Sequence, residues 1–415
     1  MKVALVHDYI KEYGGAERVL ETLHEIYPDA PVYTTVYLPK FLGPHRERFE
    51  GRMGELGESG KWDIRTSLLQ NLPFKAKLIS PIRLISPIIF GMFDFSKFDV
   101  VIVSATGAYF PNSIRIKKQE LRIKGKKSQR PKTKDQPPVH VCYCHTPPRY
   151  LYGYATAREW KKNIFLRVVG EIMNHFLRLV DYKSAQNVDY FIANSKNVED
   201  RISKFYRKES TIIYPPIDIK SNLKSQISNL HLESKNYFIC GGRLARAKHT
   251  DIIVRACREL NIPLKIFGKG FAGYEQELRS MNYESGKKNH NSKIEFVGEV
   301  SDEEKLELMR GAKAFIFASE DEDFGITPVE AMSVGTPIIA YRSGGVKETV
   351  VDGKTGIFFN ELTVESLCNA IKHYDNTYYH SGIKPGDCIK QAQNFSKEKF
   401  KQEIKNFVNA KANSS

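Results

Sequence analysis

The chain alternates short apolar runs with longer stretches in which apolar residues recur every three or four positions. The first apolar run covers residues 2–7, and Gly14-Gly15 separates it from a helical pattern over 16–26. An apolar run, a glycine turn and an amphipathic helix form the opening unit of a parallel α/β domain. Further runs of strand length lie at 99–104, 139–144, 190–194 and 211–214. This pattern predicts a first α/β domain.

A second alternating series follows the polar stretch 220–235. Its predicted strands are 237–240, 264–267, 294–297, 314–317 and 337–340, and its predicted helices are 249–260, 302–311, 328–334 and one from about 363. Strands that alternate with helices indicate a parallel sheet with both faces covered. After Phe395, apolar residues at 400, 404 and 407 keep helical spacing and predict an amphipathic helix.

The length of the chain supports a division into two domains. A chain of 415 residues exceeds the size at which one hydrophobic core keeps growing. We expect an N-terminal domain over 1–218, a second domain over 219–394 and a C-terminal helix over 395–415. A ligand cleft between the two domains is the natural expectation.

The charge of the chain predicts an anionic partner. The net charge is +15, and the segment 115–135 holds ten Lys and Arg residues against two acids. Phosphate-bearing substrates, nucleic acid and the acidic face of a membrane all fit such a balance. The segment is either a solvated loop or a patch for phosphate or lipid headgroups, and its composition leaves both open.

No run is long and apolar enough to span a bilayer. The nearest is 78–93, which Pro81, Arg83 and Pro87 interrupt, and we expect it to pack in the interior rather than against a membrane. Six scattered cysteines lack C-x-x-C spacing, which argues against a disulfide framework and a structural zinc site. Cys142 and Cys144 should share one face of a strand. The chain opens without a signal-peptide layout, and we expect a cytoplasmic protein.

The most informative stretch runs from Glu322 to Glu330 and contains Gly325. Thr327 is a suitable N-cap and Pro328 a suitable first helical residue, which would place Glu330 third, in a capping box. A glycine loop that leads into a helix N-terminus offers free N–H groups and a positive dipole, a site suited to a diphosphate. Carboxylates beside it accept hydrogen bonds from sugar or ribose hydroxyls. Capping alone also explains Glu330 without a ligand.

Two further segments fit a phosphate site. Gly241-Gly242-Arg243 follows a strand and leads to Lys248. The glycines allow a ligand to approach the backbone, and the two cations Arg243 and Lys248 can balance its phosphates. Gly14-Gly15 forms the corresponding turn of the first domain. Basic residues after a strand also serve plain solvation, and a glycine pair also serves a tight turn.

Together these motifs resemble the family 4 retaining glycosyltransferases. The resemblance covers nearly the whole chain, including His7-Asp-Tyr, Tyr143-Cys-His145-Thr-Pro-Pro and Ala193-Asn-Ser195. It implies two facing Rossmann-like domains with parallel sheets and an interdomain cleft, the GT-B type, with the last helix crossing back onto the first domain.

The resemblance also implies roles for individual residues. The donor-binding residues would be Gly14, Gly15, Arg243, Lys248, Phe324, Gly325, Ile326, Thr327 and Glu330. Arg243 and Lys248 would hold the diphosphate, Glu330 the ribose, and the amides of 324–327 would complete the pocket. Glu322 and His145 would stand beside the transferred sugar as the catalytic pair. From its sequence position alone, without the resemblance, His145 is better interpreted as a core histidine beside a strand end.

The implied reaction is the transfer of a hexose, with mannose as a candidate, from a GDP- or UDP-hexose to a glycan or lipid-linked acceptor in polysaccharide biosynthesis. Bacterial mannosyltransferases that build surface polysaccharide are the most similar members. The family needs no cofactor, and we expect no metal although Asp321-Glu-Asp323 imitates the metal-binding pair of another glycosyltransferase fold. Peripheral contact with an anionic inner membrane face is a further expectation.

Two other classes of protein compete with this hypothesis. Gly268-Lys-Gly270-Phe-Ala-Gly273 follows a predicted strand and spells the dinucleotide fingerprint of an NAD-dependent oxidoreductase. It lies inside the second domain rather than at its first turn, which weakens the match. The basic surface fits a nucleic-acid or lipid-binding module, although we expect no nucleic-acid partner.

Overall fold

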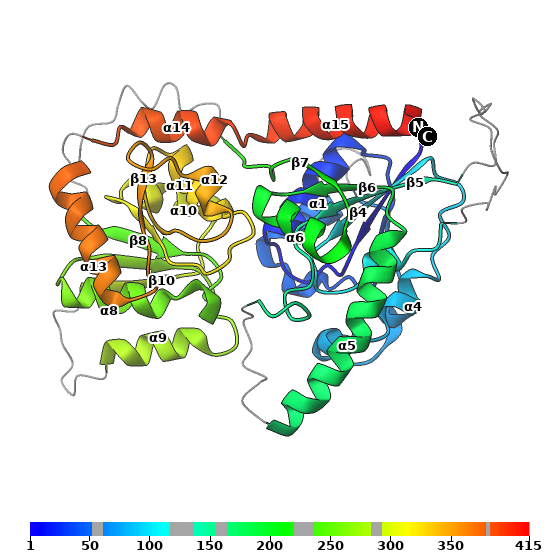
Figure 1. Ribbon diagram of the computed structural model, residues 1–415, viewed down its shortest axis with the longest axis horizontal. Helices are drawn as coiled ribbons and strands as arrows, with labels where there is room; N and C mark the ends of the chain where they lie inside the picture. Colours follow the sequence, from blue (N-terminus) through cyan, green and yellow to red (C-terminus); the bar gives the residue numbers. More distant parts are fainter. Residues whose placement is uncertain are drawn as a thin grey trace.

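A computed structural model describes residues 1–51, 61–116, 137–154, 164–219, 236–283, 293–378 and 382–414. It contains two α/β units, each built around a parallel sheet (Figure 1). The predicted fold class is confirmed. Nearly all of the basic segment 115–135 lies outside the described residues, so its two interpretations both stay open.

The first sheet is parallel throughout and has seven strands in the order β3-β2-β1-β4-β5-β6-β7. The strands are β1 (Val3–His7), β2 (Val32–Thr34), β3 (Ile64–Thr66), β4 (Val100–Ala105), β5 (Val139–Cys144), β6 (Tyr190–Ala193) and β7 (Ser210–Ile212). Both faces of the central strands are buried. On β5, Val141 and Tyr143 enter one apolar core while Cys142 and Cys144 enter the other, as the alternation predicted.

Helices cover both faces of this sheet. They are α1 (Gly15–Ile26), α2 (Glu47–Glu50), α3 (Lys75–Ile82), α4 (Ser86–Phe90), α5 (Ile164–Gln186) and α6 (Lys196–Tyr206), with a short 3-10 helix η4 (Pro111–Ser113). Helix α1 buries Val19, Leu20 and Leu23, which are spaced as one helical face. Ser195 caps α6 by accepting a hydrogen bond from the Val198 amide.

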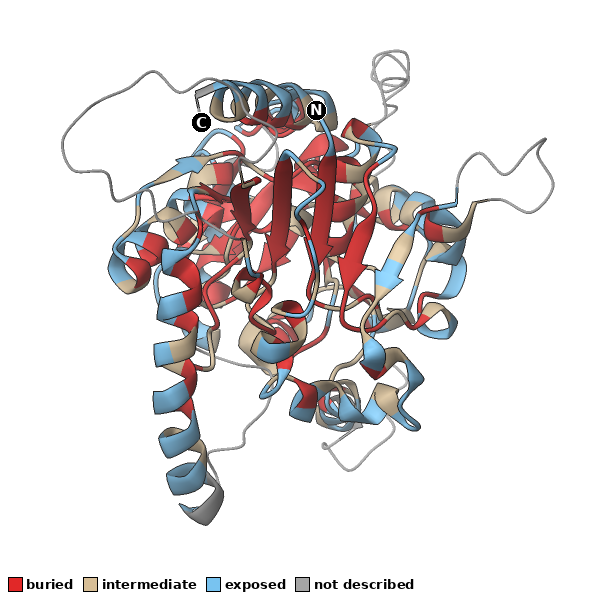
Figure 2. Ribbon diagram, turned by 90° about the vertical axis from the view of Figure 1, so that its right-hand side faces the viewer, coloured by how far each residue is buried: buried red, intermediate tan, exposed pale blue. Residues whose placement is uncertain are grey.

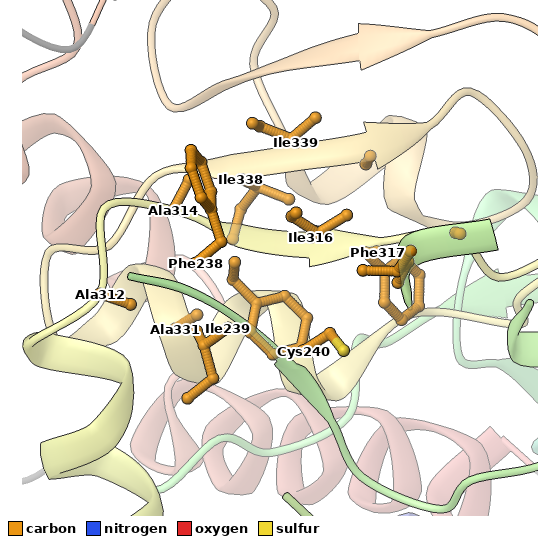
Figure 3. Close-up of a cluster of buried hydrophobic side chains, with 14 of the residues drawn as sticks. Phe238, Ile239, Cys240, Ala312, Ala314, Ile316, Phe317, Ala331, Ile338 and Ile339 are labelled. Carbon is orange, nitrogen blue, oxygen red and sulfur yellow. The ribbon is translucent and has the colours of Figure 1, made fainter. Parts of the chain in front are cut away.

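The second sheet has six parallel strands in the order β10-β9-β8-β11-β12-β13. They are β8 (Phe238–Gly241), β9 (Leu264–Phe267), β10 (Ile294–Gly298), β11 (Phe315–Phe317), β12 (Ile338–Tyr341) and β13 (Gly356–Phe359). The helices are α8 (Thr250–Glu259), α9 (Tyr274–Tyr283), α10 (Asp302–Arg310), α11 (Ile326–Ser333), α12 (Val346–Thr349), α13 (Val364–His373) and α14 (Pro385–Gln393). Figure 3 shows part of its core, in which Phe238, Ile316 and Ile339 come from three strands.

Helix α15 (Lys397–Ser414) joins the two units. It follows α14 on the second domain and runs along the first domain beside α1 (Figure 1). Its side chains Phe400, Ile404 and Val408 are buried in the core of the first domain, next to Tyr143. The amphipathic pattern of the tail is therefore satisfied by a surface more than 200 residues away in sequence.

The segment 78–93 departs from the interior packing that its apolar sequence predicted. Ile82 and Phe90 are buried, but the side chains of Leu78, Leu84, Ile85, Ile88 and Met92 are exposed. The proline breaks split the segment into two short helices, α3 and α4, and each can turn only part of its surface toward the core. Within the described residues, no helix has the length and apolar character of a membrane span.

Candidate functional site

The candidate site lies where the strand order reverses in each sheet. In the first sheet β1 stands between β2 and β4, and in the second sheet β8 stands between β9 and β11. Loops that leave the carboxyl ends of strands at such a switch point diverge and leave a crevice for a ligand. Gly14-Gly15 follows β1, Lys248 follows β8, and Glu322 follows β11.

Helix α11 begins with its free amides in this crevice. Its N-cap is Gly325, at φ +92°, and Ile326 is the first helical residue. The predicted capping box is wrong, because a glycine in the left-handed region turns the chain into the helix two residues before Thr327. The first N–H groups of α11 therefore have no side-chain cap, and the Glu330 carboxylate is available for other partners.

Two neighbouring cations, Lys248 and Arg149, lower the pKa of Glu322 and keep it ionised. Its Oε2 accepts hydrogen bonds from Lys248 and, at 2.7 Å, from the Ser319 hydroxyl. Burial raises the pKa of this carboxyl, but the charges of Lys248 and Arg149 outweigh it and lower the pKa to about 2. The sequence-predicted residues Lys248 and Glu322 thus form one charged pair at the carboxyl ends of β8 and β11.

The loop before α11 is held by backbone contacts. The Gly345 amide donates to the Glu322 carbonyl at 2.7 Å. A Cβ atom at Gly344, at φ +69°, would lie 2.2 Å from the Glu322 oxygen, and one at Gly345 would lie 2.4 Å from the Asp323 oxygen. Two glycines are therefore needed for this close approach. Sequence reasoning missed both, although the Gly-Gly pair after a strand was the available signal.

The acidic neighbours of Glu322 are engaged by the first domain. Asp323 forms ion pairs with Arg149, at 2.9 Å, and with Arg201. The Ser195 hydroxyl donates to the Asp323 carbonyl at 2.5 Å. Asp321 and Asp323 thus take part in a contact between the domains. Among the residues that the structure describes, no three His, Cys, Asp or Glu side chains gather as a metal-ligand cluster.

Glu330 makes its ion pairs on both sides of the crevice. It binds Lys305 of its own domain at 2.8 Å and Arg18 of helix α1 in the other. Burial raises the pKa of the Glu330 carboxyl, and the charges of Arg18 and Lys305 reverse the shift and lower it. Asp302 pairs with the same two cations, at 3.1 Å from Arg18 and 2.9 Å from Lys305.

The two cations that pair with Glu330, Arg18 and Lys305, and the acid Asp302 that shares them were not among the predicted site residues. Arg18 stands directly after the Gly14-Gly15-Ala-Glu motif and is the fourth residue of α1. This position was the only signal in the sequence. Together with Tyr13, Arg48 and residues of α10 they line one pocket between the domains.

The two glycine turns both face the start of α11. A Cβ atom at Gly15 would lie 2.6 Å from the Ile326 Cδ1, so the first domain approaches α11 at this point. The Gly14 amide donates to Glu17 at 2.9 Å. On the other side, a Cβ at Gly242 would lie 3.6 Å from the Thr327 hydroxyl oxygen. The predicted donor-binding residues Gly14, Gly15, Gly325, Ile326 and Thr327 are thus brought together.

Two predicted residues lie differently from that group. The Phe324 ring is buried at 5.6 Å from Tyr214 and 5.4 Å from Phe395, so its side chain belongs to the core and only its backbone can serve a ligand. Arg243 is more than half exposed and pairs across the crevice with Glu12 at 3.4 Å. Its long side chain is at the rim.

His145 follows β5 and belongs to a polar chain inside the first domain. Its Nε2 lies 2.9 Å from the Ser104 hydroxyl, which is 3.1 Å from Nδ1 of the buried His7. The far nitrogen of His7 lies 3.6 Å from Glu17. Burial and the nearby His7 lower the pKa of His145 to about 3, so its imidazole is neutral at physiological pH.

The glycines of the dinucleotide-like motif have a structural role. Gly268 follows β9 at φ +112°, and a Cβ atom there would lie 1.8 Å from the Gly242 carbonyl oxygen. The Gly270 amide donates to Glu275 at 3.0 Å. This turn packs against the glycine pair after β8 and so shapes the phosphate side of the crevice, which accounts for its glycines without a second nucleotide.

Comparison with known proteins finds a family match over most of the second domain. Residues 222–395 match the family model of the glycosyl transferases group 1. The alpha-1,3/1,6-mannosyltransferase ALG2 of Dictyostelium discoideum is 28% identical over 305 residues, which cover 64% of this chain and 69% of that protein. The lipopolysaccharide core biosynthesis mannosyltransferase LpcC of Rhizobium leguminosarum is 28% identical over 201 residues, or 46% of this chain and 55% of LpcC.

Solved structures share the whole fold. HepE of Anabaena, solved in complex with UDP, superposes with a TM-score of 0.64 at 17% identity and covers 99% of this chain and 100% of its own. Sucrose-phosphate synthase of Thermosynechococcus elongatus gives a TM-score of 0.67 at 15% identity over 100% of both chains. The resemblance to glycosyltransferases of the two-domain type is confirmed.

Proposed function

We propose, from the match of residues 222–395 to the family model of the glycosyl transferases group 1, that the protein is a retaining hexosyltransferase that uses a nucleoside diphosphate sugar. One observation carries the proposal. The uncapped N-terminus of α11 stands between two ionised glutamates, Glu322 and Glu330, each already paired with a cation, and faces Gly15 of the other domain.

Each group in the crevice has a counterpart in such a donor. The diphosphate binds the free amides of α11 and the ammonium of Lys248, with Arg243 reaching in from the rim. Glu330 accepts hydrogen bonds from the ribose hydroxyls, and Glu322 accepts them from the transferred hexose. His145 serves as a hydrogen-bond partner of the sugar from the first domain. Its lowered pKa keeps the imidazole neutral, so it does not attract the phosphate as a cation would.

The reaction needs no nucleophile from the protein. The bond between the anomeric carbon and the β-phosphate oxygen breaks while the acceptor oxygen bonds to the same face of that carbon. The acceptor proton passes to the phosphate oxygen that leaves. Lys248, Arg243 and the α11 amides stabilise the negative charge that grows on the diphosphate, and this electrostatic contribution is the main catalytic one.

The relatives support a proposal for the substrates. ALG2 and LpcC are mannosyltransferases, and HepE was solved with UDP. We propose a GDP- or UDP-hexose as donor, with mannose as the first sugar to test, and a glycan or lipid-linked acceptor of polysaccharide biosynthesis. The charge of +15 favours work at the anionic cytoplasmic face of a membrane. No metal is required, because Lys248, Arg243 and the α11 amides supply the charge that would stabilise the leaving group.

A thermal-shift titration tests the class and the metal together. GDP, UDP, ADP and NAD are each added to the protein in the presence of EDTA. A ligand that binds only the folded state stabilises it by about 2.7 kcal/mol at 100 times its dissociation constant. Stabilisation by one nucleoside diphosphate is expected. Stabilisation by NAD alone would favour the oxidoreductase, and no shift by any of the four would refute a nucleotide site.

A further inference from the structure

The first domain exposes an unusual amount of apolar surface on helix α5. Its N-terminal half extends away from the sheet (Figure 1), and among the side chains described between 164 and 173 none is buried. The exposed fraction is 80% for Ile164 and 61% for Phe176. Other exposed large apolar residues of the helix are Val168, Val169, Ile172, Met173, Leu179 and Tyr182. Isolated exposed apolar side chains are ordinary, but a set of this size on one helix indicates an interaction surface.

The exposed side chains follow the helix period. Ile164, Val168, Ile172 and Phe176 are four residues apart, so they share one side of α5. The opposite side holds the helix on the domain through Asn174, Leu177 and Asp181, which are buried. Figure 2 shows this division along the helix, with exposed residues outward and buried ones toward the sheet.

A second exposed apolar surface of the first domain lies on the segment 68–92. Residues 68–92 expose Leu68, Leu72, Phe74, Leu78, Leu84, Ile85, Ile88 and Met92, with Phe74 at 77%. Phe110 connects the two surfaces, because its amide donates to Ser86 of α4 at 3.3 Å and its ring packs with Leu177 of α5. The Arg83 guanidinium, 4.0 Å from the Tyr150 ring, is a further link.

The charges on these surfaces are almost entirely positive. Residues 68–92 contain Lys75, Lys77 and Arg83 and no acid. The exposed part of α5 carries Arg167, Arg178 and Lys183 against Glu171. Apolar residues interleaved with Lys and Arg are the composition that binds the interface of an anionic bilayer, since acyl chains accept the first and headgroups the second. A second copy of the chain would instead bring like charges together.

We propose that α5 and the segment 68–92, named here the docking face, seat the first domain on an anionic phospholipid bilayer. The basic segment 115–135, which suggested a headgroup patch from the sequence, is not needed for this. The docking rests on the surface residues alone, and only its purpose, bringing the crevice to a membrane-bound acceptor, rests on the proposed function.

The docking face is also mechanically connected to the crevice. The chain leaves His145 and passes Arg149, which contacts the Asp321 carbonyl and the Asp323 carboxylate of the second domain. It then reaches Leu151, whose carbonyl accepts from Arg178 of α5 at 2.9 Å. Leu151, which contacts α5, thus lies six positions after the candidate catalytic His145 in the chain. This short connection suits an acceptor that is held at the membrane surface.

Vesicle co-sedimentation of the full chain tests the proposal. Vesicles of phosphatidylcholine alone are compared with vesicles of phosphatidylcholine and phosphatidylglycerol in equal parts. The double variant Ile172→Asn, Phe176→Asn removes two exposed apolar side chains from α5. The control variant Phe41→Asn, Val351→Asn removes two that are exposed elsewhere.

The wild type and the control should bind the anionic vesicles and bind the neutral ones far more weakly. Burial of one large apolar side chain accounts for about tenfold in partitioning, so the α5 double variant should bind about 100-fold more weakly. Equal binding by the two double variants would overturn the proposal. So would a wild-type dimer in sedimentation velocity that the α5 variant alone dissociates, since a second copy would then be the occupant.

A nucleotide titration of the same variants separates this inference from the proposed function. The α5 variant should keep the wild-type thermal shift with the nucleoside diphosphate, which shows that it is folded. Loss of vesicle binding with an intact shift supports the docking face. An intact shift with unchanged vesicle binding refutes the docking face and leaves the proposed function standing.

Discussion

Glu322 in the crevice and Asp181 at the base of α5 are two enclosed carboxyl groups with opposite pKa shifts. Burial raises the pKa of Asp181 to about 7, and the hydroxyls of Tyr152 and Tyr206, which donate to it, only reduce that rise. Burial acts in the same direction on Glu322, yet Lys248 and Arg149 bring its pKa to about 2.

The difference comes from the groups that surround each carboxyl. Asp181 has neutral partners, the hydroxyls of Tyr152 and Tyr206, and ties α5 to the domain through them. Neighbouring cations lower the pKa of both Glu322 and Glu330 against the effect of burial. Cations placed in a crevice beside carboxylates and free helix amides are available to a phosphate as well. The comparison therefore separates a carboxyl with neutral hydrogen-bond partners from two carboxyls that are paired with cations.

Removal of Lys248 should give the largest effect. Under the proposed function, Lys248→Ala deletes a charge that stabilises the leaving diphosphate, and it leaves Glu322 with a higher pKa. We expect kcat for hexose transfer to fall by about 100–1000-fold. Lys265→Ala is a matched control, because Lys265 is equally exposed and also pairs with a glutamate, Glu295. A similar rate for both variants would remove Lys248 from the mechanism.

The pH dependence of stability tests the raised pKa of Asp181. A raised pKa in the folded state means that the folded protein binds more protons, so this contribution to stability is present below about pH 4 and is lost as the pH rises toward 7. For Asp181 the loss between pH 5 and 7 is about 2 kcal/mol. Asp181→Asn should lack it. Chemical denaturation of both proteins across this range provides the measurement, and parallel curves would contradict the pKa of Asp181.

Arg18 should give a smaller effect on stability. Arg18→Ala removes the partner of Glu330 from the first domain, while Lys305 remains beside the carboxylate. The lost charged hydrogen bonds are worth about 1–2 kcal/mol, which lowers the melting temperature by about 2–4 °C per kcal/mol. Arg46→Ala serves as the control, because its pair with Glu50 is exposed and lies within the first domain. An equal melting temperature for the two variants would show that the Arg18 pair contributes little.

Sequence periodicity was sufficient for the two-sheet fold. Long apolar runs such as 99–104 and 139–144 became central strands because parallel strands are buried on both faces. The three-residue strands at 32–34 and 64–66 were not predicted, since so short a run carries no periodic signal. The packing of 78–93 was also predicted wrongly, because hydropathy does not say whether an apolar helix packs against the protein core or lies on the surface.

The candidate site was predictable where one motif carries several groups. Glu322, Gly325 and Glu330 lie on one loop and helix, and local geometry brings them together. Arg18 was missed because its contact with Glu330 spans 312 residues and exists only once the domains meet. The position of the N-cap was wrong for a different reason, since propensity favours threonine and here the left-handed glycine decided it.

The most direct test of the central claim, a donor held by Glu330 through its ribose, is a binding experiment with an altered ribose. The nucleoside diphosphate found by thermal shift and its 2′,3′-dideoxy analogue are titrated calorimetrically into the wild type and Glu330→Ala. Hydrogen bonds to a charged carboxylate contribute about 1.5–3 kcal/mol, so the wild type should prefer the natural ribose by about tenfold or more. The variant should bind both ligands equally. The same preference in both proteins would place the ribose elsewhere and contradict the account.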